Sequence, residues 1–527
     1  MQAGRLVYAR GYGIADLDHN IRITPKTVFH AASLAKQFTA MCILLLVERG
    51  SLCLNDGVRK HLNPRLLNNL PSGLGEQITV RDILSHTSGI RDQFVLLTMA
   101  GWRLSDDVIT RDDVLDLVHR MNSLDFKPPR RDCLYSNTGY KLAGLIVESI
   151  SGLSLSQFAH QNIFKPLRMK RTQFYESHGL VVQNRAYGYK KTNDQHFQLR
   201  MPNYDDLTGP TNLLTTVKDL ARWDRNFERK TVGGDFALSL MRTPSTLLNG
   251  RNVSIPLAPG LKVDYGLGLM ISRYRGLNTI EHNGRDAGYR SHLIRFPDQH
   301  FGVACLCNLA LPNDVHLRNL VHRVADVYLA DQLSPASPTS QTILSQEELG
   351  SRVGVYRNSA TQSPVQISIA GGGLNISFEA IVGTLTAISR DRFRLLGPPQ
   401  PADVIFTTSG DSAKSQLLLQ VEGAQPLMFD AAPPKIPVNL TEYTGRYYSK
   451  EIDAVYNITL DGDSLAIVRR KYPKAVLRHV DENLFTTNLS DILAFCAVTF
   501  LRDAQRHIIG FQIDGLNIHG FEFKKCR

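Results

Sequence analysis

Residues 33–50 read SLAKQFTAMCILLLVERG, which places a hydroxyl and an amine at the start of an apolar segment. Good helix formers from residue 37 to 48, followed by Gly50 as a stop, predict a buried helix that begins near Ser33. Ser33 would then face the positive end of the helix dipole, with Lys36 one turn later on the same face. Desolvation there lowers the pKa of a lysine toward that of a base, which a serine needs to become a nucleophile.

The Ser-x-x-Lys pattern is weak by itself, because a chain of this length should contain about two by chance. The same residues also fit an N-cap and a lysine whose amine reaches solvent. Two further motifs follow in order along the chain. Tyr135-Ser136-Asn137 precedes the apolar helical segment 140–150, and His282-Asn283-Gly284 lies between two strand-like stretches.

In this order the three motifs resemble those of the serine penicillin-recognising enzymes, which include β-lactamases and penicillin-binding proteins. That family carries S-x-x-K, Y-x-N and a third motif, K-T-G in β-lactamases and often H-x-G in esterases and D-aminopeptidases. The resemblance spans residues 1–333 and includes GYGIAD (11–16), LSHTSG (84–89), AYGY (186–189), LARW (220–223) and YGLG (265–268). It implies an α+β, β-lactamase/transpeptidase-like domain, with an antiparallel sheet flanked by helices and a helical subdomain.

The resemblance also assigns roles, position by position. Ser33 is the acyl-accepting nucleophile, and Lys36 and Tyr135 handle its proton, with the first base left undecided between them. The two oxyanion donors are the backbone amides of Ser33 and of Arg285, the residue after the third motif. Asn137 orients Lys36 and the substrate amide, although a lone Asn before a helix also fits simple capping.

His282 departs from the β-lactamase pattern. The lysine of K-T-G is a permanent cation for a substrate carboxylate, whereas an imidazole titrates near neutrality, so efficient β-lactam hydrolysis is not expected. An isolated histidine on a strand is usually structural, but Gly284 beside it and the order of the motifs favour a place in the catalytic site. By contrast, His86 is expected to be structural. Asp286, Tyr289 and Arg290 lie where they could contact substrate near the third motif, but solvent-exposed loop residues are the favoured interpretation.

The C-terminal third of the chain has a different sequence pattern. Residues 334–346 have linker composition, and period-two strands such as VQISI (365–369) follow. This third repeats itself at a constant offset of 91 residues, for example in Tyr356 and Tyr447 and in Ile367 and Ile458. The repeat predicts two small antiparallel barrels, so the expected domains are a catalytic domain, a linker and two barrels, at residues 1–333, 334–346, 347–432 and 437–527.

One catalytic domain followed by two duplicated β units resembles the D-stereospecific aminopeptidases of bacteria. The resemblance implies a serine hydrolase that works through an acyl-enzyme on a small amide or ester, of D-aminopeptidase or D-amino-acid amidase type. The substrate would be a small molecule or a short peptide, and neither a cofactor nor a metal is expected. The alternatives are a carboxylesterase of the same family, a D,D-carboxypeptidase or β-lactamase, and a catalytically silent scaffold.

The composition of the chain argues against several other classes of protein. Hydrophobic residues at 43% and charged residues at 21% are ordinary for a globular protein, and no apolar run reaches the ~20 residues needed to cross a bilayer. The net charge of +11 comes from short basic pairs spread along the chain, so no nucleic-acid partner is expected. Seven cysteines without metal-type spacing predict free thiols, and a homodimer is left open.

The first residues raise two further expectations. Residues 1–10 lack the layout of a signal peptide, which predicts a cytoplasmic protein, or a periplasmic or secreted one if the true start lies upstream. A cytoplasmic protein would not meet the substrate of a D,D-carboxypeptidase. Residues 4–13 have the pattern of a turn and the family's second strand, so the central sheet is expected to lack its first strand and to leave backbone groups unpaired.

Overall fold

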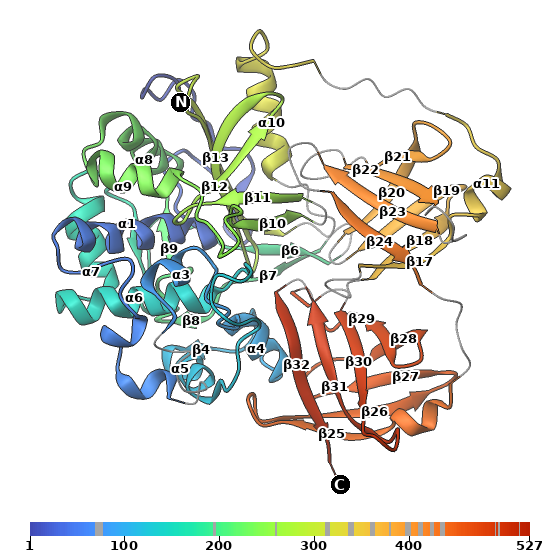
Figure 1. Ribbon diagram of the computed structural model, residues 1–527. Helices are drawn as coiled ribbons and strands as arrows, with labels where there is room; N and C mark the ends of the chain where they lie inside the picture. Colours follow the sequence, from blue (N-terminus) through green and yellow to red (C-terminus); the bar gives the residue numbers. More distant parts are fainter. Residues whose placement is uncertain are drawn as a thin grey trace. The chain divides into compact units, whose positions relative to one another are not determined.

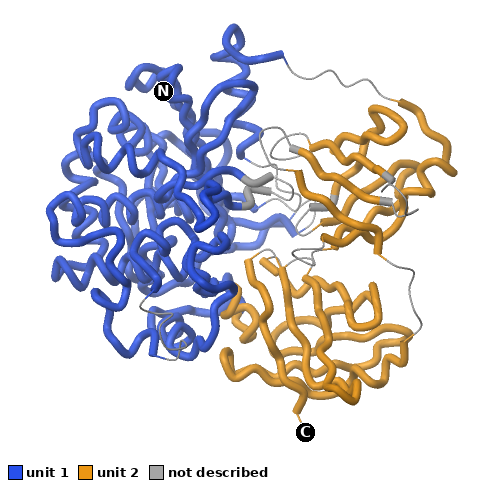
Figure 2. Tube along the Cα trace, in the orientation of Figure 1, with its two compact units in different colours: residues 1–94, 103–255, 263–335 blue, residues 95–102, 256–262, 336–527 orange. Residues whose placement is uncertain are grey.

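The computed structural model describes residues 1–68, 77–192, 196–258, 261–310, 317–335, 342–358, 364–378, 381–395, 402–408, 415–421, 426–432, 438–490, 492–493, 496–515 and 517–526. The chain, drawn in Figure 1, divides into two compact units, which Figure 2 shows in different colours. Unit 1 comprises residues 1–94, 103–255 and 263–335, and unit 2 comprises residues 95–102, 256–262 and 336–527. Part of the predicted linker, residues 336–341, lies outside the described residues.

Helix α1 (Ala35–Glu48) runs through the core of unit 1. Its residues from Ala35 to Leu46 are all buried, so the helix has no solvent-facing stripe over this length. It ends before Gly50, which adopts a φ of +71°, as the sequence predicts. Helices that pack against it include α6 (Asn137–Ser151), α7 (Leu155–Ala159) and α9 (Gly234–Arg242).

The other helical segments are mostly short. They are η1 (Ala32–Leu34), η2 (Val58–Lys60), η3 (Pro64–Leu67), α3 (Val80–Leu84), α4 (Gln93–Met99), α5 (Arg111–Arg120), η4 (His160–Phe164), α8 (Val217–Arg229) and α10 (Leu317–Tyr328). Helices α3, α5 and α7 each begin with a capping box, which fixes their first residue. Among the described residues no single helix is long and apolar enough to span a membrane; α6 and the α7–η4 segment pass together on length and composition, with a 78° bend between them.

A six-stranded antiparallel sheet in the order β10-β11-β12-β13-β14-β15 lies beside the helices (Figure 1). Its strands are β10 (Ser254–Ala258), β11 (Leu261–Tyr265), β12 (Met270–Tyr274), β13 (Leu277–Asp286), β14 (Tyr289–Phe296) and β15 (Phe301–Cys307). Helix α10 covers β14 and β15 through a core that includes Ile294, Phe301 and Val321. The mixture of helices and an antiparallel sheet confirms the predicted α+β class.

The strand predicted within residues 4–13 is wrong. The first strand is β1 (Ile14–Asp16), which pairs with β2 (Ile21–Arg22) in a separate ribbon. Gly4 and Gly13 have φ values of +69° and +77°, and such conformations interrupt an extended strand. Residues 1–2 instead meet the outer edge of β15, where Met1 and Gly302 exchange backbone hydrogen bonds.

Three small sheets also belong to unit 1. One has the order β3-β9-β5 and leads directly into η1; the others have the orders β16-β6-β7 and β4-β8. Their strands are β3 (Phe29–His30), β4 (Ile109–Thr110), β5 (Gln173–Phe174), β6 (Tyr189–Lys191), β7 (Phe197–Leu199), β8 (Tyr204–Asp205), β9 (Leu213–Thr215) and β16 (Leu309–Ala310).

Unit 2 contains two closed antiparallel barrels of eight strands each, as predicted. The first follows α11 (Gln346–Gly350) and consists of β17 (Gly354–Arg357), β18 (Pro364–Ala370), β19 (Gly373–Phe378), β20 (Ile381–Ala387), β21 (Arg392–Leu395), β22 (Ala402–Thr408), β23 (Ser415–Val421) and β24 (Leu427–Ala431). The second follows η5 (Leu440–Tyr443) and consists of β25 (Gly445–Ser449), β26 (Ala454–Asp461), β27 (Ser464–Val468), β28 (Ala475–Asp481), β29 (Leu484–Thr487), β30 (Cys496–Arg502), β31 (Ile508–Gly515) and β32 (Ile518–Lys525).

The two barrels repeat each other in register as well as in sequence. Ile367 lies opposite Ile376 in the first barrel, and the residues 91 positions later, Ile458 and Ile467, lie opposite each other in the second. In each barrel the first strand also pairs with the last, which removes the open edges of the sheet. The stretch 433–437, where the second barrel was predicted to begin, lies outside the described residues.

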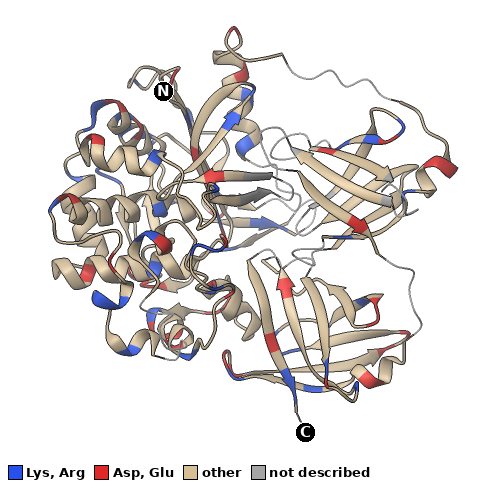
Figure 3. Cartoon of the chain, viewed as in Figure 1, with Lys and Arg blue, Asp and Glu red and all other residues tan. Residues whose placement is uncertain are grey.

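Unit 2 also includes residues 95–102, which the sequence analysis had assigned to the catalytic domain alone. Tyr456 donates a hydrogen bond to the carbonyl of Met99 at 2.9 Å, and Tyr472 donates one to the carbonyl of Trp102 at 2.7 Å. The last carbonyls of a helix have no partner within the helix, and here Tyr456 of the second barrel satisfies that of Met99, the last residue of α4. In the view of Figure 3, basic and acidic residues are both scattered along the chain.

Candidate active site

Ser33 lies in the turn η1, between β3 and α1. Ala32 just before it has a φ of +50°, a strained conformation for a residue with a side chain. The Lys36 amine donates hydrogen bonds to Ser33 Oγ at 3.0 Å, to Asn137 Oδ1 at 2.7 Å and to the carbonyl of Pro210 at 2.9 Å. Ser33 is half-buried and Lys36 is fully buried, so of the two residues only Ser33 is partly open to solvent.

Burial lowers the pKa of Lys36 to about 7, because a charged amine loses its hydration there. The negative charges of Asp92 and Asp286 oppose this shift and keep the pKa from falling further. A lysine with such a pKa is present in both its charged and its neutral form near neutrality. Only the neutral form can accept a proton from a serine hydroxyl.

The Ser33 side chain lies close enough to Tyr135 to lower the pKa of the phenol, and the Tyr135 ring centroid lies 4.9 Å from the Lys36 amine. Burial raises the pKa of Tyr135 far above its usual value, so its side chain stays a protonated phenol. His86 supports this ring from behind, with centroids 4.2 Å apart, and its Nδ1 accepts a hydrogen bond from the amide of Ser136 at 3.1 Å. Burial also keeps the pKa of His86 well below its usual value, so the ring is neutral.

Asn137 is the first residue of α6, but Ser136 is the residue that caps the helix. The Asn137 side chain is therefore free to bridge two charged groups. Its Oδ1 accepts from Lys36, while its amide nitrogens, Nδ2 and the backbone N–H, both donate to Asp92 Oδ2 at 2.7 and 2.6 Å. Asp92 is a site residue that the sequence analysis missed, although it follows the LSHTSG segment by three residues.

His282 lies on β13 and is fully buried. Its Nδ1 donates to the carbonyl of Asn283 at 2.6 Å, so Nε2 is the acceptor for the Tyr265 hydroxyl at 3.3 Å. Within the described residues, none of its hydrogen bonds goes to Ser33, Lys36 or Tyr135. Burial, with a contribution from the charge of Lys36, lowers the pKa of His282 to about 3, so the imidazole is neutral. Tyr265, which opens the YGLG segment, was not among the residues predicted for the site.

Gly284 lets strand β13 pass directly beside the turn η1. A β-carbon at this position would lie 2.5 Å from the carbonyl oxygen of Ala31 and 2.3 Å from Ser291 Oγ, so only glycine fits. Ser291 fixes the approach by donating a 2.6 Å hydrogen bond to the same Ala31 carbonyl. The contact brings the main chain at Arg285 toward that of Ser33, and the Arg285 side chain itself is exposed.

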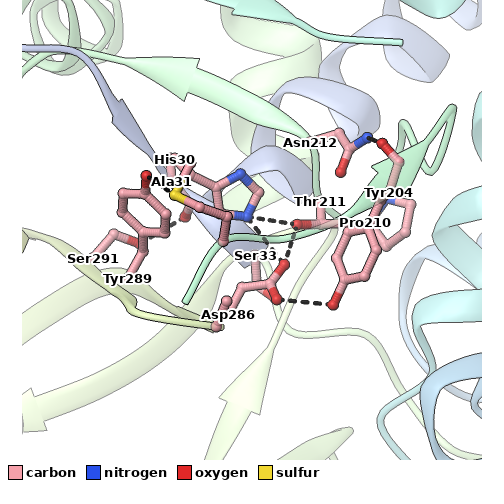
Figure 4. Close-up of polar contacts among 12 residues, drawn as sticks. His30, Ala31, Ser33, Tyr204, Pro210, Thr211, Asn212, Asp286, Tyr289 and Ser291 are labelled. Atoms are coloured by element: carbon pink, nitrogen blue, oxygen red, sulfur yellow. Dashed lines mark hydrogen bonds and ion pairs between the residues drawn. The ribbon is translucent and has the colours of Figure 1, made fainter. Parts of the chain in front are cut away.

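Asp286 is not the exposed loop residue that the sequence analysis expected. It ends β13, and its side chain is 11% exposed. Figure 4 shows its carboxylate pointing toward His30, Thr211 and Tyr204. The carboxylate accepts hydrogen bonds from His30 Nε2 at 3.0 Å, from the Thr211 hydroxyl at 2.9 Å and from the Tyr204 hydroxyl at 3.0 Å. Side chains alternate along a strand, so its period-two spacing from His282 and Gly284 was the available signal.

The structure thus gathers Ser33, Lys36 and Asn137 into one hydrogen-bonded group beside the Tyr135 ring, with His282 hydrogen-bonded to Tyr265. No group of three or more His, Cys, Asp or Glu side chains in the described part of the chain could hold a metal ion. A serine, a buried lysine of lowered pKa and a phenol, held on an α+β fold, define a serine hydrolase site of the penicillin-recognising type.

Comparison with known proteins agrees with this class. The Beta-lactamase family model matches residues 1–326, and the chain belongs to that family. Penicillin-binding protein 4* of Bacillus subtilis (strain 168) is 27% identical over 320 residues, which are 58% of this chain and 66% of that protein. Protein flp of Staphylococcus aureus (strain MW2) is 28% identical over 312 residues, 58% of each chain. The matches therefore span less than two thirds of these relatives' own lengths.

Two solved structures share the fold. The octameric penicillin-binding protein homologue from Pyrococcus abyssi aligns with a TM-score of 0.57 and 22% identity, over 81% of this chain and 94% of that one. The D-amino acid amidase from Ochrobactrum anthropi SV3, complexed with L-phenylalanine amide, aligns with a TM-score of 0.50 and 23% identity, over 61% and 89%.

Proposed function

We propose that this protein hydrolyses small amides or esters of D-amino acids through an acyl-enzyme on Ser33. The observation that carries the proposal is the buried Lys36 amine, with a pKa of about 7, at 3.0 Å from Ser33 Oγ. An amine of this pKa next to a hydroxyl is a general base at neutral pH.

In the first step, neutral Lys36 takes the proton of Ser33 as Oγ bonds to the substrate carbonyl carbon. The backbone amides of Ser33 and Arg285 stabilise the oxyanion. The bond to the leaving nitrogen or oxygen then breaks, and Tyr135 gives its proton to that atom while Lys36 restores the phenol. Tyr135 suits this donor role because its raised pKa keeps it protonated, which favours Lys36 as the first base.

In the second step, water attacks the acyl-enzyme. Lys36 and Tyr135 carry a proton from the water to Ser33 Oγ, and the acid is released. Asn137 keeps Lys36 in place through its 2.7 Å hydrogen bond and is held in turn by Asp92. Each group thus returns to its starting protonation state.

The substrate class is inferred from His282 and from the architecture. A neutral, buried His282 supplies no permanent cation, so substrates that depend on a carboxylate, such as β-lactams, lose an expected anchor. The two barrels after the catalytic unit and the fold likeness to a D-amino acid amidase favour a D-aminoacyl group as the acyl part of the substrate. A carboxylesterase of the same family is the second candidate, because a neutral third motif also suits uncharged esters.

The test is a hydrolysis panel with D- and L-alanine p-nitroanilide, p-nitrophenyl acetate and a chromogenic cephalosporin. Wild-type protein should prefer the D-alanyl substrate, and Ser33→Ala should abolish its turnover and its labelling by a fluorophosphonate. Ser51→Ala, an exposed serine just beyond α1, is the matched control and should retain both. Turnover of the acetate ester alone would replace the proposal with the esterase, and an unlabelled Ser33 would indicate a silent scaffold.

A further inference from the structure

Asp286 carries a charge that the proposed acyl transfer does not use. Its carboxylate and Gly284 both face the segment before the nucleophile, because Asp286 contacts His30 while Gly284 contacts Ala31 and Ala32. Asp286 therefore extends from β13 on the same face as the residues of the third motif. Its negative charge also acts on the Lys36 amine, whose pKa it raises.

Two connections place this carboxylate beside the reacting serine. His30, which donates to Oδ2, lies three residues before Ser33 in the chain. Thr211, which donates to the same oxygen, directly follows Pro210, whose carbonyl accepts from Lys36. The carboxylate is thus tied to both segments that hold the Ser33 and Lys36 pair.

The surroundings of Asp286 form a built site. His30 is 0% exposed, Thr211 3% and Tyr204 1%, and Tyr175 holds the far nitrogen of His30 at 3.2 Å. Of these three hydrogen bonds, two go to Oδ2 and one to Oδ1, whereas a carboxylate offers about four acceptor positions. The donors are one imidazole and two hydroxyls, so the carboxylate, whose side chain is 11% exposed, keeps acceptor capacity for a ligand.

We propose that Asp286 binds the α-ammonium group of the substrate, so that this enzyme acts on aminoacyl amides or esters with a free amino group. The inference rests on the proposed function. If the substrate carbonyl oxygen lies on the amide of Arg285, the α-nitrogen, two bonds from the carbonyl carbon, lies beside the next residue on the active-site face. A carboxylate there supplies the charged hydrogen bond that an ammonium group needs when water is displaced.

A purely structural Asp286 would behave differently. It would hold β3 and residues 208–212 together for every substrate alike. An ammonium-binding Asp286 affects only substrates that carry the ammonium group. Comparing a charged substrate with its desamino analogue therefore separates the two roles.

The experiment measures kcat/KM for D-alanine p-nitroanilide, N-acetyl-D-alanine p-nitroanilide and propionyl p-nitroanilide, with wild type and Asp286→Asn. The asparagine keeps the shape of the side chain, and Thr211 and His30 can each reverse their hydrogen-bonding role to accept from it. We expect Asp286→Asn to lower kcat/KM for the free alanyl substrate by about 10- to 100-fold, the range of one charged hydrogen bond. For the two uncharged substrates, which have no ammonium group to lose a charged hydrogen bond, kcat/KM should change less than about twofold.

Asp331→Asn removes an exposed charge from the same unit and is the matched control. Asp286→Glu should recover part of the lost activity toward the alanyl substrate alone. Equal losses for all three substrates in a variant that still labels with fluorophosphonate would overturn the inference and leave the proposed hydrolase intact. A wild-type enzyme that prefers the acetylated or desamino substrate would also overturn it, whereas no turnover of any amide or ester would defeat the proposed function itself.

Discussion

The pKa of Lys36 allows the pH dependence of kcat/KM to be predicted quantitatively. If neutral Lys36 is the base, kcat/KM should follow the neutral fraction of this amine, because kcat/KM reports the free enzyme. With a pKa of about 7, half of the amine is neutral at pH 7 and about 1% at pH 5, so kcat/KM should fall about 100-fold from its plateau to pH 5. His282, with a pKa of about 3, should add no inflection between pH 5 and 9.

The direction in which a charge substitution shifts the pKa of Lys36 also tests whether Lys36 is the base. Asp92 raises the pKa of Lys36, so Asp92→Asn should lower that pKa and move the acid limb to lower pH. Relative to its own plateau, the variant should then retain more activity at pH 5 than wild type does. Asp331→Asn, which is exposed, should leave the midpoint where it is.

The assay is the initial rate with p-nitrophenyl acetate, which does not titrate in this range, from pH 5 to 9. Circular dichroism at each pH separates loss of fold from loss of base. A kcat/KM profile that is flat between pH 5 and 8, or an acid limb that moves upward in Asp92→Asn, would refute the role given to Lys36.

Three further substitutions test other parts of the structure. Gly284→Ala should reduce fluorophosphonate labelling of Ser33 by at least about tenfold, because its β-carbon collides with the backbone beside η1, whereas Gly350→Ala, with open space around it, should be neutral. Tyr456→Phe should lower the free energy of unfolding by about 1–2 kcal/mol in urea denaturation, because it leaves the buried carbonyl of Met99 without a donor. His282→Lys should destabilise the protein by about 3 kcal/mol in the same assay, because it buries a second cation near Lys36, and any remaining activity should show an acid limb at lower pH.

The outline of the fold could be predicted from sequence because the signals are local or periodic. The helix after Ser33 follows from its run of helix formers, and the duplication at an offset of 91 residues predicted two barrels that then appeared with matching register. The strand expected within residues 4–13 failed because the pattern there did not reveal that Gly4 and Gly13 adopt positive φ. The attachment of residues 95–102 to the second barrel was also beyond the sequence, since it depends on hydrogen bonds between residues over 350 positions apart.

By itself the sequence determined which residue types stand at Ser33, Lys36, Tyr135, Asn137 and His282, and for the first two also their spacing of one helical turn. Only the tertiary structure decided how these groups ionise, because a pKa depends on burial and on charges brought from distant parts of the chain. Asp92 and Asp286 became visible as members of the site in the same way. Their neighbours, Asn137 and His30, lie 45 and 256 residues away along the chain, and no local pattern reports such a distance.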